Sequence, residues 1–169
     1  MSTAKVKNGF SLIELLIVVA VIGVLAAIAI PSLLASRRAA NEGSAVSSLR
    51  IICSAEATYQ STVGGGSYGS LASLSASSFV DTVVGSASIG GGTPKSGYLF
   101  SAEPLVVGTI AAFDAKAQPS IFAGTNPTNG TGSRSFFVNE SGVIFYNLTA
   151  TAPTCTATPS RAVTGTVFN

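Results

Sequence analysis

The sequence predicts an α+β protein in which one long N-terminal helix packs on a small antiparallel β-sheet. Three observations carry this prediction. Residues 10–35 are almost all apolar, and residues 36–62 repeat apolar side chains at helical spacing. After residue 97, short runs alternate apolar and polar side chains, as half-buried strands do. The 169 residues suffice for one folded domain behind such a helix.

Composition excludes several classes of function. Charged residues make up 9% of the chain, against roughly a quarter in an ordinary soluble domain. The chain has no His, which excludes imidazole-based catalysis and His-containing zinc sites. Beyond the N-terminal leader the acidic and basic residues balance, so the sequence predicts no nucleic-acid partner. Paired carboxylates, a phosphate-binding loop and a nucleophile elbow are missing, and we expect no enzyme, no cofactor and no metal site.

A short polar leader, residues 1–9, precedes the apolar segment 10–35, which is long enough to span a membrane. No polar side chain interrupts the run Leu15–Ile30. Glu14 lies at the start of this segment, although a carboxylate costs about 2.5–3.5 kcal/mol on membrane-insertion scales. Three interpretations follow from these features alone: a signal peptide cleaved near residues 27–29, an ordinary anchor with the acid at the membrane interface, or a more specialised segment.

The string Gly9-Phe10-Ser11-Leu12-Ile13-Glu14, continued through the apolar run to Pro31, resembles the N-terminal signature of type IV pilins and pseudopilins. The resemblance implies that a prepilin peptidase cuts after Gly9 and that the new N-terminal Phe10 is N-methylated. The amine of Phe10 is then a natural partner for Glu14 of a neighbouring copy. Because either charge buried alone is costly, such a pair sets the register of assembly.

Gly23 and Pro31 lie inside the same predicted helix. Proline removes a backbone hydrogen bond and costs ~3 kcal/mol in a helix interior, and glycine costs up to ~1 kcal/mol relative to alanine. We expect a kink. The resemblance further suggests that the stretch between the two residues loses helical order in a filament, which would make the filament extensible.

The second half of the helix, residues 36–62, has an amphipathic pattern that predicts one buried stripe. Its predicted members are Val46, Leu49, Ile52, Cys53 and Ala57. The charged residues take other positions, where we expect a solvated face, with pairing between subunits as the alternative. These residues are Arg37, Arg38, Glu42, Arg50 and Glu56. The three glycines at 64–66 end the helix near Thr62.

Residues 63–169 form the predicted globular domain. It begins with a connecting region, 64–97, in which we expect a short helix at 78–84. Four short strands follow as an antiparallel meander that packs one face on the stripe around Cys53. Their alternating residues are Tyr98, Phe100 and Ala102; Ala111, Phe113, Ala115 and Ala117; Phe136 and Val138; and Val143 and Phe145. A hairpin turn is predicted at 139–142.

The two cysteines are Cys53 and Cys155. An exported domain lies where disulfides persist, and we expect the two to pair. That bond would close a loop of about 100 residues and tie the end of the chain to the helix. The alternative is a buried thiol at Cys53 and a free one at Cys155. Many pilins carry both cysteines in the C-terminal half, so the resemblance does not imply that family's disulfide loop here.

The resemblance implies a structural subunit of a type IV pilus, polymerised through its N-terminal helix for adhesion or twitching motility. The alternatives are a pseudopilin or minor pilin of a type II secretion or DNA-uptake machine, and a plain exported single-pass protein. The implied partners are other copies of the chain, the prepilin peptidase, an inner-membrane assembly platform and the membrane itself. We expect an inner-membrane protein with a cytoplasmic N-terminus before assembly, and an extracellular filament afterwards.

Overall fold

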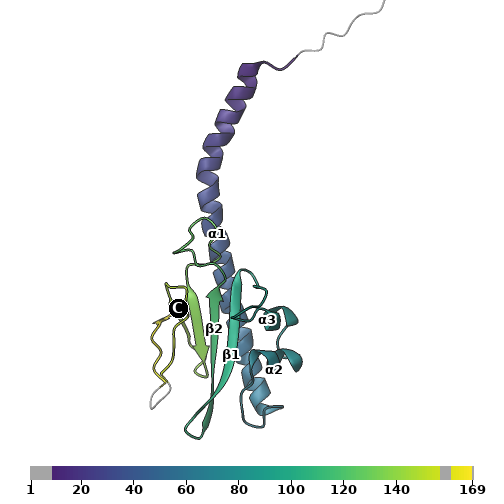
Figure 1. The fold of residues 1–169 in the computed structure, drawn as a ribbon, viewed down its shortest axis with the longest axis vertical. Helices are drawn as coiled ribbons and strands as arrows, with labels where there is room; N and C mark the ends of the chain where they lie inside the picture. The colour runs from purple at the N-terminus through teal and green to yellow at the C-terminus, as the bar shows by residue number, and fades with distance from the viewer. Residues whose placement is uncertain (1–8, 157–160, 169) are drawn as a thin grey trace, which may run out of the picture. The chain divides into compact units, whose positions relative to one another are not determined.

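The computed structural model describes residues 9–156 and 161–168. The predicted leader therefore lies outside the described residues, except for Gly9. The chain divides into two compact units, one ending at Ser36 and one beginning at Arg37. Helix α1 (Leu12–Ser61) contributes its first half to the N-terminal unit and its second half to the C-terminal unit (Figure 1). The other elements are α2 (Leu71–Ala76), α3 (Thr82–Ser86), β1 (Tyr98–Val107), β2 (Ile110–Pro119), β3 (Ser135–Asn139), β4 (Ile144–Asn147) and β5 (Thr166–Val167).

The sheet of the C-terminal unit has five antiparallel strands in the order β1-β2-β3-β4-β5. Every strand pairs with its neighbour in sequence, so the predicted meander is confirmed, with one more strand than expected. Strands β1 and β2 pair over their full length, from Tyr98 opposite Pro119 to Val107 opposite Ile110. Only two residues connect them, and Gly108 has a φ of 66°, which glycine adopts without strain.

One face of the sheet packs on the second half of α1 and forms the core. The predicted alternation is confirmed for the first three strands, whose inward residues are buried with the helix, except that Ala111 is half-buried and lies outside the core. It is wrong for the fourth strand, where Ile144 and Tyr146 face the core instead of Val143 and Phe145. The reason is register, because Val138 lies opposite Ile144, and a shift of one residue exchanges the two faces of a strand.

The buried stripe of α1 also differs from the prediction. Ala57 is exposed and Cys53 is half-buried. The buried residues are Ala45, Val46, Ser48, Leu49, Ile52, Ala55 and Glu56. The stripe is thus rotated toward Ala55 and Glu56, because the sheet and the connecting region meet the helix on that side. The expectation of a solvated face is wrong for Glu56.

The connecting region contains two short helices instead of the one predicted at 78–84. Ser70 caps α2 by accepting the Ser73 backbone N–H at 3.2 Å. Asp81 caps α3 by accepting the Val83 backbone N–H at 3.3 Å. Both helices lie beside β1, at the edge of the sheet (Figure 1). Short capping side chains therefore start two separate short helices in this Ser-rich stretch.

Candidate assembly segment

The chain enters α1 through two exposed residues. A Cβ atom placed on Gly9 would have no neighbour within 4 Å. The side chain of Phe10 is 84% exposed. The peptide bond that joins these residues is therefore accessible from solvent.

Glu14 closes the first turn of α1. The Ser11 backbone N–H donates a hydrogen bond to Glu14 Oε2 at 2.9 Å. The Ser11 carbonyl accepts the backbone N–H groups of Glu14 and Leu15 at 3.2 and 3.3 Å. The carboxylate thus satisfies a free N–H at the helix start and complements the positive end of the helix dipole. The side chain is exposed, and no described residue donates to its other oxygen.

The first half of α1 exposes an almost continuous apolar surface. By length and composition, α1 is the one helix in the described part of the chain that fits a membrane crossing. The exposed large apolar residues of this first half are Leu12, Ile13, Leu15, Leu16, Ile17, Val18, Val19, Val21, Ile22, Val24, Leu25, Ile28, Ile30 and Leu33. A helix that is apolar on all sides requires lipid or other apolar helices around it.

Helix α1 runs through Gly23 and Pro31 without interruption. A Cβ atom on Gly23 would meet nothing within 4 Å, so no close packing requires a glycine at this position. The expected kink and the loss of helical order in a filament stay predictions.

Where α1 enters the C-terminal unit, at residues 38–42, its polar side chains hold the loop 120–134 in place. Arg38 donates to backbone carbonyls of this loop, including that of residue 130 at 3.4 Å. Asn41 donates to another of its carbonyls at 2.9 Å. Glu42 accepts both the backbone N–H and the hydroxyl of Ser133, at 2.8 and 2.7 Å. These charged and polar groups therefore hold the fold together, where the sequence predicted a solvated face.

Glu56 is a fully buried carboxyl group near the end of α1. Its Oε2 accepts the Gly69 backbone N–H at 2.9 Å, and its Oε1 has no hydrogen-bond partner. Burial raises the pKa of Glu56 to about 7, and the bond from Gly69 offsets only part of this effect. The pKa of the neighbouring Cys53 thiol is also raised, first by burial and then by the charge of Glu56. Glu56 therefore links α1 to the segment that leads into α2 and titrates near neutral pH.

Arg161 fastens the C-terminal segment to the sheet. Its guanidinium donates to Asp114 at 2.6 Å, to Glu140 at 2.7 Å and to the Phe113 carbonyl at 2.9 Å. Asp114 alternates with the core-facing Phe113 and Ala115, so this cluster lies on the face of the sheet opposite α1. The two carboxylates thus share the Arg161 cation. Burial lowers the pKa of Arg161, but the hydrogen bonds to Glu140 and Asp114 outweigh this effect and raise the pKa.

The two cysteines are free thiols, so the expected disulfide is not present in the structure. Cys53 packs against the core on the α1 side of the sheet. Cys155 interacts with Arg161 and Asp114 on the opposite side, and burial raises the pKa of its thiol. The sheet lies between the two sulfur atoms. Within residues 9–156 and 161–168, no cluster of three His, Cys, Asp or Glu side chains is placed to hold a metal ion.

Several of these groups were missed by reasoning from sequence. The capping role of Glu14 was readable, because Ser followed three residues later by Glu before an apolar run is a known helix-start pattern. The Arg161 cluster had no such signal, since its acidic partners lie 47 and 21 residues away along the chain. The burial of Glu56 likewise could not be predicted from the sequence, because it depends on where the sheet and the connecting region pack against α1.

Residues 4–30 match the family described as the prokaryotic N-terminal methylation motif. The resemblance predicted from the N-terminal residues is thus confirmed, and the chain carries this motif. Over 35 residues it is 63% identical to the type IV wide pilus major component PilA4 of Thermus thermophilus. This similarity covers 21% of the chain and 27% of the PilA4 sequence, so the chain spans about a quarter of that protein's length. No solved structure matches the chain significantly.

Proposed function

We propose that the chain is a structural subunit of a type IV pilus, polymerised through the first half of α1. One observation carries the proposal. The methylation motif introduces a helix whose first half exposes its large apolar residues. Such a helix suits storage in a membrane and later packing against identical helices. Adhesion and twitching motility are the activities that a filament of this kind supports.

Maturation begins at the Gly9–Phe10 bond. A prepilin peptidase cuts after Gly9, where the missing side chain lets an enzyme approach the backbone closely. Phe10 then carries a free amine, which the same enzyme methylates. The exposure of both residues and the match of residues 4–30 to the methylation motif support this step.

Glu14 guides assembly through its free carboxylate oxygen. One oxygen already accepts the Ser11 N–H, so the other can receive a cation without disturbing the helix start. After cleavage the Phe10 amine of the same chain lies one residue from Ser11 and competes for this oxygen. A subunit that docks with its own Phe10 amine at a neighbour's Glu14 buries both charges as a pair, which favours one register over shifted ones.

The remaining partners follow from the same proposal. Before assembly the subunit is held in the inner membrane with its N-terminus in the cytoplasm, and an assembly platform extracts it into the extracellular filament. Gly23 and Pro31 lower the helical stability of the extracted segment, which allows local loss of helical order and extension under load. In this proposal the protein acts by assembling and carries out no catalysis.

The direct test is intact-mass and N-terminal peptide analysis of protein from sheared surface material. We expect a chain that starts at Phe10 and carries one methyl group, recovered in the filament fraction. A chain that starts near Ile30 would identify an ordinary signal peptide and overturn the proposal. The mature mass found only in the membrane fraction would favour the pseudopilin alternative.

Glu14→Val and Glu14→Gln test the role in register. Both variants keep the cleavage site, so we expect normal processing. Both lose the charge that pairs with Phe10, and we expect little of either variant in filaments when it is expressed beside the wild type. Incorporation equal to that of the wild type would contradict the pairing, and the glutamine variant controls for the loss of side-chain volume.

A further inference from the structure

The β1–β2 hairpin extends past the rest of the sheet. β3 pairs with β2 only at residues 114–117, so the hairpin beyond Asp114 is a two-stranded ribbon. Side chains alternate along a strand and antiparallel partners share a face, which places Glu103, Leu105 and Ile110 on one face of this ribbon. Ile110 is 72% exposed and Leu105 is 36% exposed. The ribbon therefore presents an apolar end, formed by Leu105 and Ile110, and Glu103 lies on the same face farther from the turn.

Glu103 carries an unneutralised charge. It lies directly opposite Asp114 in the strand pairing. Asp114 and Glu140 already share the guanidinium of Arg161. Among the described residues no basic side chain pairs with Glu103. A cation brought to this face would meet an uncompensated carboxylate.

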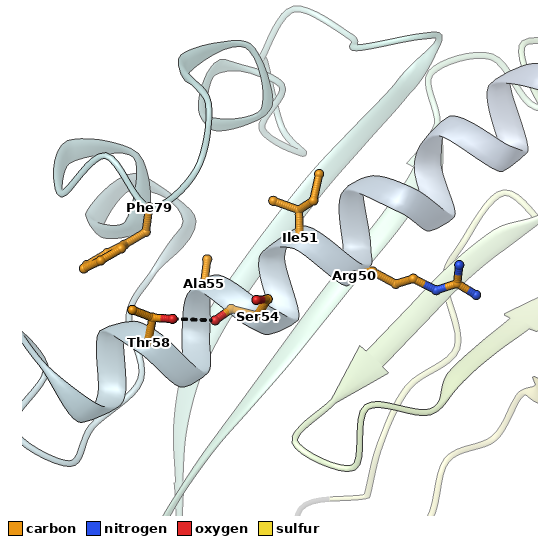
Figure 2. A pocket seen from close by; sticks show the side chains of 6 residues that line it. All are labelled: Arg50, Ile51, Ser54, Ala55, Thr58 and Phe79. Carbon is orange, nitrogen blue, oxygen red and sulfur yellow. Dashed lines mark hydrogen bonds between the residues drawn. The ribbon is translucent and has the colours of Figure 1, made fainter.

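A shallow groove lies where α1 meets the connecting region in the C-terminal unit. It has a volume of about 330 Å³ and is lined by Arg50, Ile51, Ser54, Ala55, Thr58 and Phe79. Figure 2 shows Arg50 at one end, pointing away from Phe79, with Ile51 and Ala55 between them. Ile51 is 49% exposed, and the Phe79 ring is fixed edge-on against Tyr59 at 6.2 Å. No acidic side chain of the described residues pairs with Arg50.

The hairpin and the groove match in length, polarity and charge. Four strand residues separate Glu103 from Val107, which lies opposite Ile110, so the acid and the apolar end are about 13 Å apart. Eight helix residues separate Arg50 from Thr58, which corresponds to about 12 Å along α1. Laid lengthwise, the hairpin would bring its acid to Arg50 and its apolar end to the Phe79 end of the groove.

We propose that the hairpin face formed by Glu103, Leu105 and Ile110 docks in the α1 groove of a neighbouring copy of this chain, with Glu103 paired to Arg50. The inference rests on the proposed filament and adds a contact between the C-terminal units. The two surfaces are different patches of one chain, so the contact is head-to-tail and continues from copy to copy without closing. This is the form of contact that an open filament requires.

Cross-linking of sheared filaments tests the contact. The variant carries Ile110→Cys and Thr58→Cys, which the proposed docking brings together at the Phe79 end of the groove, in a background with Cys53→Ser and Cys155→Ser. A short bismaleimide should join successive subunits and give a ladder of trimers and larger species on a denaturing gel. Each single cysteine should give no ladder. The matched control pairs Thr58→Cys with Leu148→Cys, which replaces another exposed apolar residue, and it should give no ladder.

Three outcomes overturn the inference. Filaments of the double-cysteine variant that give no ladder show that the surfaces do not meet. Dimers from Ile110→Cys alone show that two hairpins contact each other instead. A ladder from the Leu148→Cys control shows that the cross-linker reports crowding. By contrast, failure of the wild-type chain to yield sheared filaments that start at Phe10 overturns the proposed function itself.

Charge exchange tests the same contact without cysteines. Arg50→Glu and Glu103→Arg each place like charges together, and we expect about tenfold less protein in the sheared fraction. The combined variant restores opposite charges and should recover most of the wild-type amount. Equal amounts from all three variants, or a combined loss without recovery, would overturn the pairing of Glu103 with Arg50.

Discussion

The two units of the chain use their apolar residues in opposite ways. From Leu12 to Leu33 the large apolar side chains of α1 are exposed all round the helix. From Arg37 onward the same helix buries one stripe under an antiparallel sheet and carries polar groups that fasten loops. The first unit is thus stable only in contact with lipid or other helices, and the second contains its own core. Changes in the first unit should affect assembly, and changes in the second should affect unfolding.

Under the proposed maturation, Gly9→Val should have the largest effect, because it should block processing completely. The wider side chain hinders close approach of the peptidase, and we expect the surface fraction to lose the protein. The retained product should keep the leader in an intact-mass measurement. A Cβ atom on Gly9 would meet no described residue within 4 Å, so the melting temperature of the C-terminal unit should not change. Ile13→Val is the control and should be processed normally; a mature mass from the Gly9 variant would disprove the cleavage site.

Phe136→Ala should destabilise the C-terminal unit by about 3–5 kcal/mol, because the ring is fully buried and its removal leaves a cavity. Ile22→Ala removes an apolar side chain that is 59% exposed, and it should change the free energy of unfolding by less than about 0.5 kcal/mol. Urea unfolding of the full chain in detergent measures both. Similar losses of unfolding free energy from the two variants would contradict the distinction between the units.

Arg161→Ala should cost about 2–4 kcal/mol, since it leaves Asp114 and Glu140 without their shared cation. Arg161→Lys keeps the charge but loses the forked geometry, and it should recover only part of the loss. Limited proteolysis should show earlier cleavage of the C-terminal segment in the alanine variant. Wild-type resistance in that variant would mean that the cluster does not hold this segment.

Glu56→Gln should make stability less dependent on pH. In wild type the folded pKa is about 7, whereas an unfolded glutamate has a pKa of about 4.3. Below the unfolded value the carboxyl is protonated in both states. As pH rises from there to 7, the unfolded chain releases its proton first, so the free energy of unfolding falls. The variant should therefore gain about 2–3 kcal/mol on wild type at pH 8 and much less at pH 5.

Thermal unfolding of Glu56→Gln and wild type at the two pH values measures this difference. Glutamine keeps an acceptor for the Gly69 N–H, so the structure should persist. Glu42→Gln is the matched control, because Glu42 lies on the same helix, is only half-buried and accepts two hydrogen bonds from Ser133. A gain that is equal at pH 5 and pH 8 would exclude titration of Glu56 as the cause.

The sequence by itself determined the features that depend on local order along the chain. The N-terminal motif, the apolar run and the end of α1 near Thr62 were all predictable, because helical spacing and breaker residues act over a few positions. Strand alternation at Tyr98–Ala102 and at Phe136–Val138 was predictable for the same reason. The capping of Ser11 by Glu14 also follows from a local pattern, Ser followed three residues later by Glu.

Only the tertiary structure decided what depends on pairing between distant segments. The register of β4, the face of α1 that carries Glu56 and the separation of Cys53 from Cys155 all follow from where the sheet lies against the helix. Likewise, the free hairpin end exists because β3 pairs with β2 only as far as Asp114, the residue opposite Glu103. A local pattern assigns each residue a face within its own element. Which face is buried, and beside which partner, is decided by the packing of the whole unit.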